Sequence, residues 1–401
     1  MENILSSICE FVNGKICLDE LNESTYISTE NMLPNRGGIT KASSLPSTTY
    51  SRLFLKEDVL VSNIRPYFKK IWIAKFDGGC SNDVLVFRAK SHIDSKFLYY
   101  LLSDDSFFEY ATLTAKGTKM PRGDKIAIMN YEIPIFPLKE QQKISKILSS
   151  LDEKIEINRK INENLEDQAK EIFKRWFVDY EFPNEAGQPY KSNGGQMIES
   201  ELGLIPKDWE ISNVFENVDI IKDRNKNNLN LPVLSVVKEG KFVYSDEYFN
   251  KQVYSKNISK YKLVNEYDIA YNPSRANIGS IAMLKNFVNI GIISPIYVVF
   301  RLKEKIVPNF FDYYMKLPNF IRMINLNSSG TVRQNFDFNG FKNFNIIIPP
   351  SLIQKKFDEF IIKIENLILH NKHEIRKLSS LRDTLLPKLM TGEIDVSEID
   401  I

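Results

Sequence analysis

The sequence predicts an α+β protein with a pseudo-two-fold internal repeat, in which two similar globular portions are separated by an antiparallel coiled coil of two long helices. Three observations lead to this prediction. A helical pattern of apolar residues occupies the middle of the chain, the second half repeats the first at one constant offset, and a stretch without apolar periodicity lies between the two copies.

The first long helix is predicted over residues 138–178. From Gln141 onward apolar residues recur at helical spacing, and Pro137 stands just before them, as is common at a helix start. At ~1.5 Å per residue such a helix is about 60 Å long, too long for the core of one compact domain. Every seventh position forms a seam: Ile144, Leu151, Asn158, Leu165 and Ile172. This pattern is typical of a coiled coil and calls for a partner helix, although periodicity alone also fits a generic helix bundle.

The partner helix is predicted within residues 351–401, at an offset of 213 residues. The offset places a second seam at Phe357, Ile364, Asn371, Leu378 and Leu385, so that even the asparagine recurs. The match continues upstream without a gap, pairing Phe87-Arg88 with Phe300-Arg301, Tyr100 with Tyr313, Gly117-Thr118 with Gly330-Thr331, and Gln141 with Gln354. Two copies of one unit can bury their seams on each other as an antiparallel pair. We expect Asn158 and Asn371 to pair there and to set the register.

The remaining segments are two globular portions and a connector. The globular portions are residues 1–137 and 205–350, and the connector is residues 179–204, rich in Pro, Gly, Asn and Ser. Strands are expected within 58–76 and 83–90 and within the counterparts 268–286 and 296–303, and helices within 94–113 and 308–326. Each globular portion is therefore predicted to be α+β.

Composition narrows the class of protein. The chain has 401 residues, 43% of them hydrophobic, enough for two or three ordinary cores. Its three cysteines have no metal-ligand spacing, which suits a reducing cytoplasm, and no apolar stretch reaches the roughly 18 residues of a membrane span. The net charge is only +2, but residues 205–350 contain nineteen Lys and Arg against thirteen Asp and Glu, whereas residues 1–138 contain sixteen of each. Charge thus favours a nucleic-acid partner for the second portion alone.

Two pairs of matched loops are the candidate DNA contacts. AKGTKMPRGD (115–124) and SSGTVRQNFD (328–337) occupy the same place in the two copies, and SNIRPYFKK (62–70) matches YNPSRAN (271–277). In the second pair we place Asn63, Arg65 and Tyr67 opposite Asn272, Ser274 and Arg275. Such side chains bond to base edges in the major groove, whereas the alternative is that these are ordinary solvated turns. The DNA-binding candidates are Asn63, Arg65, Tyr67, Lys116, Lys119, Arg122, Asn272, Ser274, Arg275, Arg333, Gln334 and Asn335.

Catalytic and metal-binding signatures are weak. NPSR (272–275) is only partly similar to the loop with which adenine methyltransferases hold a flipped base, because it lacks the second proline and the stacking aromatic residue. There is no GxxxxGK[ST] motif and no glycine-rich turn for a nucleotide cofactor. HNKH (370–373) is better explained as a surface pair than as a metal site. A binding protein is therefore expected, either a DNA reader or a coiled-coil scaffold that does not read DNA.

The helical regions and the connector resemble a known family. PLKEQQKISKILSSLDEKIEINRKINENLEDQAKEIFKRWF, EFPNEAGQPYKSNGGQMIESELGLIPKDWE and LRDTLLPKLMTGEI are similar to the specificity subunit of type I restriction-modification systems. The resemblance covers essentially the whole chain. It implies two target recognition domains, 1–137 and 205–350, which each read half of a bipartite sequence with a fixed spacer in double-stranded DNA.

The same resemblance implies partners. A specificity subunit is not catalytic and has no cofactor of its own. It docks two modification subunits, which carry S-adenosylmethionine for DNA methylation, and restriction subunits, unless it is an orphan or regulatory form. One departure is that the second portion opens with IPKDWE, as the family's domains often do, whereas the first begins at MENILSSICEFVNGK. We expect its opening strand to be shortened or rebuilt.

Both long helices end in apolar clusters. These are Ile172, Phe173, Trp176 and Phe177 in the first helix, and Leu381, Leu385, Leu386 and Leu389 in the second. The clusters either pack on the globular portions or form docking sites for the modification subunits.

Overall fold

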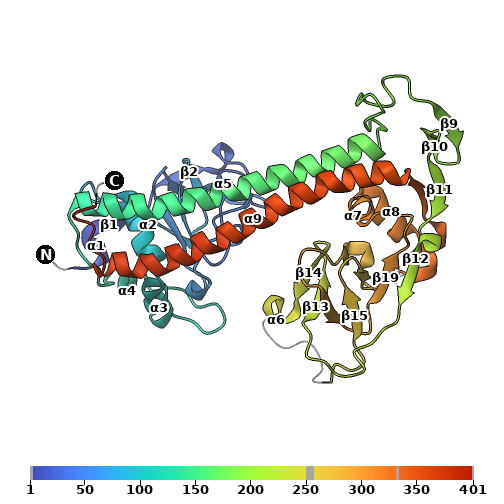
Figure 1. Cartoon of the computed structure of the whole chain (residues 1–401). Helices are drawn as coiled ribbons and strands as arrows, with labels where there is room; N and C mark the ends of the chain where they lie inside the picture. The colour runs from blue at the N-terminus through green and yellow to red at the C-terminus, as the bar shows by residue number, and fades with distance from the viewer. Residues whose placement is uncertain (1–2, 250–256, 331–333, 400–401) are drawn as a thin grey trace. The chain divides into compact units, whose positions relative to one another are not determined.

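The computed structural model describes residues 3–249, 257–330 and 334–399. The chain divides into two compact units. The first unit comprises Met1–Arg159 with Lys372–Ile401, and the second comprises Lys160–Asn371. Both units mix helices and strands, as the predicted α+β class requires. The long helices α5 (Leu138–Phe177) and α9 (Ser351–Met390) each contribute residues to both units (Figure 1).

The first unit contains two four-stranded sheets. One sheet is antiparallel throughout, in the order β1 (Cys9–Phe11), β8 (Val84–Ala89), β5 (Val59–Ser62), β6 (Ile71–Ile73). The other has the order β2 (Lys15–Cys17), β4 (Tyr50–Phe54), β7 (Gly78–Cys80), β3 (Tyr26–Ile27), with β3 parallel to β7. The helical elements are α1 (Leu5–Ile8), η1 (Leu18–Glu20), η2 (Pro66–Phe68), α2 (Ser95–Ser103), α3 (Asp105–Leu113) and α4 (Lys125–Met129). Asp94, Asp104 and Asp124 cap the helices α2, α3 and α4 by accepting backbone N–H groups.

The second unit repeats this plan. Its antiparallel sheet has the order β12 (Val218–Ile221), β19 (Val298–Leu302), β16 (Ile269–Tyr271), β17 (Ile281–Met283). Its other sheet has the order β14 (Lys241–Tyr244), β13 (Val233–Val237), β18 (Ile290–Ile293), β15 (Lys262–Asn265), again with one parallel pair, β13 and β18. The helical elements are η3 (Phe215–Asn217), α6 (Ser245–Tyr248), η4 (Ala276–Ile278), α7 (Pro308–Met315), α8 (Pro318–Leu326) and η5 (Phe338–Asn343).

The repeat is also present in individual polar contacts. Arg88 forms two hydrogen bonds with the buried Asp58, at 2.8 and 2.7 Å, and Arg301 does the same with the buried Asp268, at 2.6 and 3.0 Å. Gln141 and Gln354 each donate to a carbonyl just before the long helix and accept a backbone N–H from the start of α2 or α7. The duplication therefore preserves the contacts that hold strands and helices together.

The two units differ where they begin. In the second unit β11 (Glu210–Asn213) pairs with β20 (Asn345–Ile348) over four residues. Among the described residues of the first unit, Ile4 forms a β-bridge with Glu132 in the same place.

Segments of α5 and α9 run antiparallel within each unit. In the first unit Arg382 bonds Asp152 at 2.7 Å and Asn158 bonds Glu374 at 2.7 Å, and in the second unit Asn371 bonds Asn162 at 2.9 Å. The expectation that Asn158 and Asn371 pair with each other is therefore wrong. The antiparallel register sets Asn371 opposite Asn162, one helical turn beyond Asn158. Each seam asparagine is satisfied by a different side chain of the facing helix.

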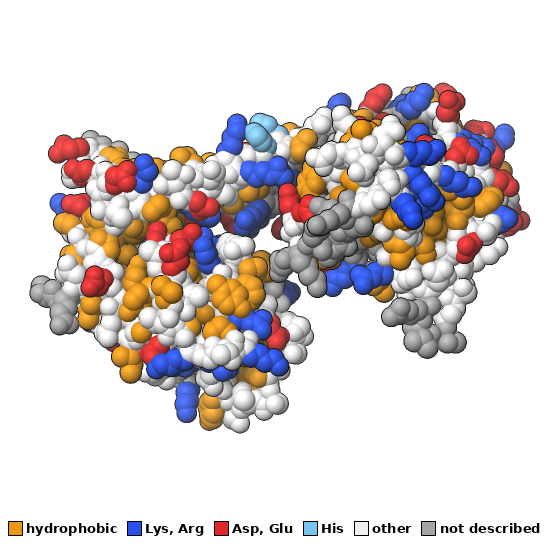
Figure 2. All heavy atoms as spheres, turned by 90° about the horizontal axis from the view of Figure 1, so that it is seen from below, with side chains coloured by type: hydrophobic (Ala, Val, Ile, Leu, Met, Phe, Trp, Pro, Cys, Tyr) orange, Lys and Arg blue, Asp and Glu red, His pale blue; other side chains and the backbone are white. Residues whose placement is uncertain are grey.

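Side chains of every kind occur at the surface (Figure 2). In the described part of the chain, no helix is long and apolar enough to cross a membrane.

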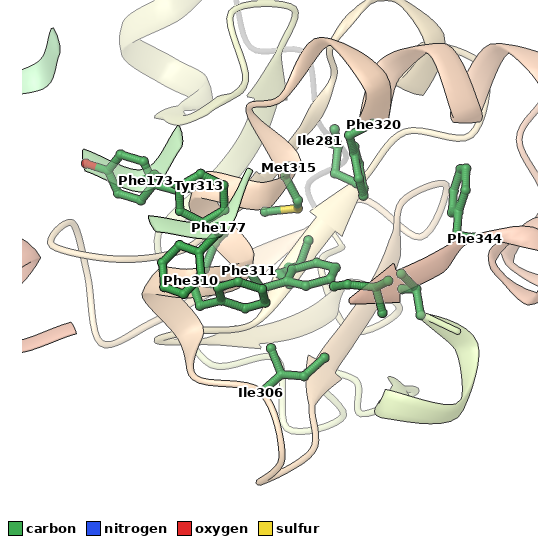
Figure 3. Packing of buried hydrophobic residues seen from close by; sticks show 14 of the residues in the cluster. Phe173, Phe177, Ile281, Ile306, Phe310, Phe311, Tyr313, Met315, Phe320 and Phe344 are labelled. Atoms are coloured by element: carbon green, nitrogen blue, oxygen red, sulfur yellow. The ribbon is translucent and has the colours of Figure 1, made fainter. Parts of the chain in front are cut away.

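The apolar ends of both long helices are buried within the units. Phe173 and Phe177 of α5 belong to the core of the second unit, where Phe177 lies 4.9 Å from Phe310 and 5.1 Å from Phe357 between ring centroids (Figure 3). Leu386 and Leu389 of α9 belong to the core of the first unit, together with Ile144. The sequence predicts that these clusters either pack on the globular portions or form docking sites. The first alternative is correct for Phe173, Phe177, Leu386 and Leu389.

The segments that follow the helices complete the same cores. After α5, the hairpin of β9 (Met197–Ser200) and β10 (Gly203–Pro206) lies between the buried Phe182 and Trp209, which join the core of the second unit. After α9, Val396 is buried in the first unit and Lys143 donates to the carbonyl of Ser397 at 2.7 Å.

The repeated carboxylates provide a test of the fold. Asp58→Ala and Asp268→Ala should each lower the free energy of unfolding by about 2–3 kcal/mol, because each change removes two arginine hydrogen bonds and one backbone bond from a buried site. Urea unfolding followed by tryptophan fluorescence measures the effect. The control Asp219→Ala, at an exposed position, should change stability by less than about 0.5 kcal/mol. Equal stability of all three variants would contradict the stabilising role of Asp58 and Asp268.

Candidate nucleic-acid interface

In the first unit, the structure brings the two predicted loops together. Arg65 donates its backbone N–H to Pro121 at 2.8 Å, and Gly123 donates to Asn63 at 3.1 Å. Ile64 forms a β-bridge with Arg122, which also bridges Lys116 across its own loop. Loops 62–70 and 115–124, about fifty residues apart in sequence, therefore form one surface.

The second unit joins its two loops in the same way. Phe336 donates its backbone N–H to Pro273 at 3.0 Å, and Ser329 bridges Asn335 across the loop. Two side-chain hydrogen bonds also connect the loops: Asn277 donates to Gln334 at 2.9 Å, and Ser274 donates to Asn335 at 3.4 Å. Arg333 lies outside the described residues.

The correspondence between the first loops differs from the sequence pairing. Ser62 donates to Lys70 at 3.0 Å, and Asn272 donates to Ser280 at 3.1 Å, so Ser62 is the counterpart of Asn272. Arg65 is therefore equivalent to Arg275, and Asn63 is equivalent to Pro273 rather than to Asn272. The sequence pairing is wrong because it sets Asn63 against Asn272 and Arg65 against Ser274, an offset of 209, whereas Asp58 and Asp268 of the preceding segments hold an offset of 210.

The candidate side chains differ in accessibility. Tyr67, Lys116, Lys119, Arg122, Ser274, Arg275, Gln334 and Asn335 are exposed, and Arg65 and Asn272 are half-buried. Asn63 is only 7% exposed, so its side chain is buried rather than presented at the surface. Arg122 and Lys116 form ion pairs with Asp83 and Asp124. Among the described ion pairs none involves Lys119 or Arg275, which leaves these two cations accessible to a phosphate or a base.

Both sets of loops adjoin unsatisfied polar atoms. Asn63 Oδ1, Arg65 Nε and Tyr271 Oη are buried without a hydrogen-bond partner, and within the described residues they are the side-chain atoms of this kind. Burial raises the pKa of the Tyr271 hydroxyl, which is neutral at ordinary pH. Arg65 and Lys69 also have left-handed backbone angles, with φ of 50° and 51°. Buried polar atoms without a partner and uncommon backbone angles are concentrated at functional sites. Here Asn63, Arg65 and Lys69 lie in the turn that follows β5, and Tyr271 is the last residue of its counterpart β16.

Sequence reasoning missed two residues of this surface. Asp83 holds the Arg122 guanidinium through two hydrogen bonds, at 3.0 and 3.4 Å, and Asn277 holds Gln334. The hydrogen bonds and charge of Asp83 raise the pKa of Arg122. Their role follows only from the folded loops, because Asp83 lies 39 residues from Arg122 in sequence.

No metal-binding cluster of His, Cys, Asp or Glu is found among residues 3–249, 257–330 and 334–399.

Comparison with known proteins shows which proteins this chain resembles. Residues 4–167 match the family model described as the type I restriction modification DNA specificity domain. The MjaIX specificity subunit of Methanocaldococcus jannaschii is 28% identical over 320 residues, which cover 77% of this chain and 71% of that protein. Over most of its length the chain is similar to the type I restriction-modification specificity subunits. The MjaVIII specificity subunit of the same organism is 27% identical over 417 residues, covering 99% of this chain and 93% of the relative.

The fold agrees with this family. The S subunit of a type I restriction-modification system from M. genitalium superposes with a TM-score of 0.57 at 16% identity, over 97% of this chain and 96% of that one. Residues 4–167 match a DNA specificity domain, and the two pairs of loops are the candidate DNA contacts.

The exposed loop residues of the second unit provide a test. Arg275→Ala and Gln334→Ala should each weaken binding to the specific sequence by about 1–3 kcal/mol if they contact bases, and should leave binding to unrelated duplex unchanged. Titrations of fluorescent duplexes at fixed salt concentration measure both affinities.

Lys207→Ala is the control, because Lys207 lies in the segment after β10 and bonds Gln196. Equal weakening of binding to all sequences would assign Arg275 or Gln334 to phosphate contacts instead.

Proposed function

We propose that this chain reads a bipartite sequence in double-stranded DNA, one half with each unit. Residues 1–137 and 205–350 act as the target recognition domains, and 179–204 connects the copies. The observation that supports this is the recurrence, in both units, of two loops joined by the equivalent backbone bonds Gly123 to Asn63 and Phe336 to Pro273. A duplicated reading surface fits a target with two parts.

The helices 138–178 and 351–401 set the separation of the half-sites. A pair of long helices is stiff, so the spacer between two half-sites on one face of the duplex is about one helical turn from centre to centre. The partly buried hydrogen bonds from Asn158 to Glu374 and from Asn371 to Asn162 support a single register of the pair.

The chain itself is a non-catalytic subunit without a cofactor. It assembles with two modification subunits, which hold S-adenosylmethionine and methylate adenine, and with restriction subunits. Exposed apolar side chains on the long helices support docking along the helices: Ile157 and Ile161 on α5, and Leu367 and Leu369 on α9. The helix ends are occupied by intramolecular packing and are not proposed as docking sites.

The decisive experiment is a map of modified adenines in host DNA, with and without this gene. We expect a single bipartite motif that disappears when the gene is deleted. A motif that persists without the gene, or one without a central spacer, would overturn the proposal. Selection from a randomised duplex library by the complex should recover the same motif, whereas a scaffold that does not read DNA would enrich no sequence.

The helix pair should determine the length of the spacer between the half-sites. Inserting four residues between Leu151 and Asn158 shifts the later seam residues on one helix only, and should change the spacer of the selected motif or abolish assembly. The control is a four-residue insertion after Gly187, an exposed turn of the connector, which should leave the spacer unchanged. An unchanged spacer with full activity in the helix variant would contradict the proposal that the helix pair sets the spacer length.

A further inference from the structure

Each unit presents one apolar side chain at the tip of the turn beside its loops. Phe68 is the last residue of η2 and is 38% exposed, and Ile278 is the last residue of η4 and is 57% exposed. With Arg65 equivalent to Arg275, Phe68 is the counterpart of Ile278. An exposed apolar residue is common on a protein surface, but the same position is apolar in both copies, although the residues differ.

Both turns have the same pattern of backbone hydrogen bonds. Phe68 donates to Arg65 at 3.0 Å and Lys69 donates to Pro66 at 2.8 Å, while Ile278 donates to Arg275 at 3.2 Å and Gly279 donates to Ala276 at 3.0 Å. Lys69 and Gly279, which end the two turns, both have positive φ, of 51° and 97°. These bonds hold the backbone of each turn at the residue that bears the apolar side chain.

Basic residues lie in or next to both turns. The Phe68 ring lies 4.8 Å from the ring of Tyr67, and the Lys70 ammonium group lies 5.9 Å from its centre. In the second unit, the turn bears the exposed Arg275, and Asn277 of the same turn bonds Gln334 of the neighbouring loop. Such a combination of apolar and basic side chains suits a polyanion with apolar surface, because the cations can contact its negative charges and the apolar side chain can contact its apolar surface.

We propose that Phe68 and Ile278 each make an apolar contact with a base in the half-site read by their own unit, and so help to determine its sequence. This inference rests on the proposed bipartite reading. The apolar surface of DNA is found on its bases, in the methyl group of thymine and the base faces, and not on its phosphates. The two turns would therefore add shape recognition to the hydrogen bonds of the adjoining loops.

Selection from a duplex library with randomised positions tests this inference. The full chain, in complex with its modification subunits, is compared as wild type, Phe68→Ala and Ile278→Ala. We expect each variant to lose at least tenfold of the enrichment at one or two adjacent positions, in one half-site for Phe68→Ala and in the other for Ile278→Ala. Phe68→Leu and Ile278→Leu should retain most of the enrichment, because they keep an apolar side chain.

Matched controls are Ile135→Ala and Leu204→Ala, which remove exposed apolar side chains, 57% and 58% exposed, in segments away from the loops. Thermal unfolding of every variant checks the fold, and the leucine variants carry the comparison if an alanine variant unfolds. An unchanged motif in Phe68→Ala and Ile278→Ala, or an equal loss at all positions, would overturn the base contacts while leaving bipartite reading intact. Failure of the wild type to enrich any sequence would instead overturn the proposed function.

Discussion

The structure depends on the burial of each long helix in two different cores. Helix α5 contributes Ile144 and Leu148 to the core of the first unit and Phe173 and Phe177 to the core of the second. Helix α9 does the reverse, with Phe357 in the second unit and Leu386 and Leu389 in the first. A fully buried side chain of this size contributes about 1.5–3 kcal/mol, so neither unit is complete without the end of a helix that starts in the other.

Buried polar contacts give this apolar packing a single register. In the second unit Lys285 bonds both Asp312 of α7 and Glu365 of α9, and in the first unit Asp152 of α5 accepts bonds from Tyr100 of α2 and Arg382 of α9. The side chain of Lys285 is 14% exposed, so a shifted register would leave a largely buried charge unpaired. Apolar seams tolerate sliding better than such networks do, because apolar contacts are not directional.

The two copies keep their scaffold and differ in the side chains they present. Arg88 with Asp58 and Arg301 with Asp268 hold the same strands, and the same backbone bonds join the loops. On this common frame the first unit offers Lys119 and Arg122, whereas the second offers Arg275, Gln334 and Asn335. Because loop side chains carry little of the folding free energy, they can change while the frame is retained.

Much of this architecture is determined by the sequence itself. The spacing of apolar residues locates both long helices, and the repeat of 213 residues shows that the chain contains two copies and that 115–124 matches 328–337. These are properties of the linear chain. Tertiary structure decides which side chains meet: Asn158 bonds Glu374, Asn63 is buried, Phe177 fills a core, and Arg65 is equivalent to Arg275. Helix register, burial and loop alignment depend on groups far apart in sequence, whose contacts no local pattern records.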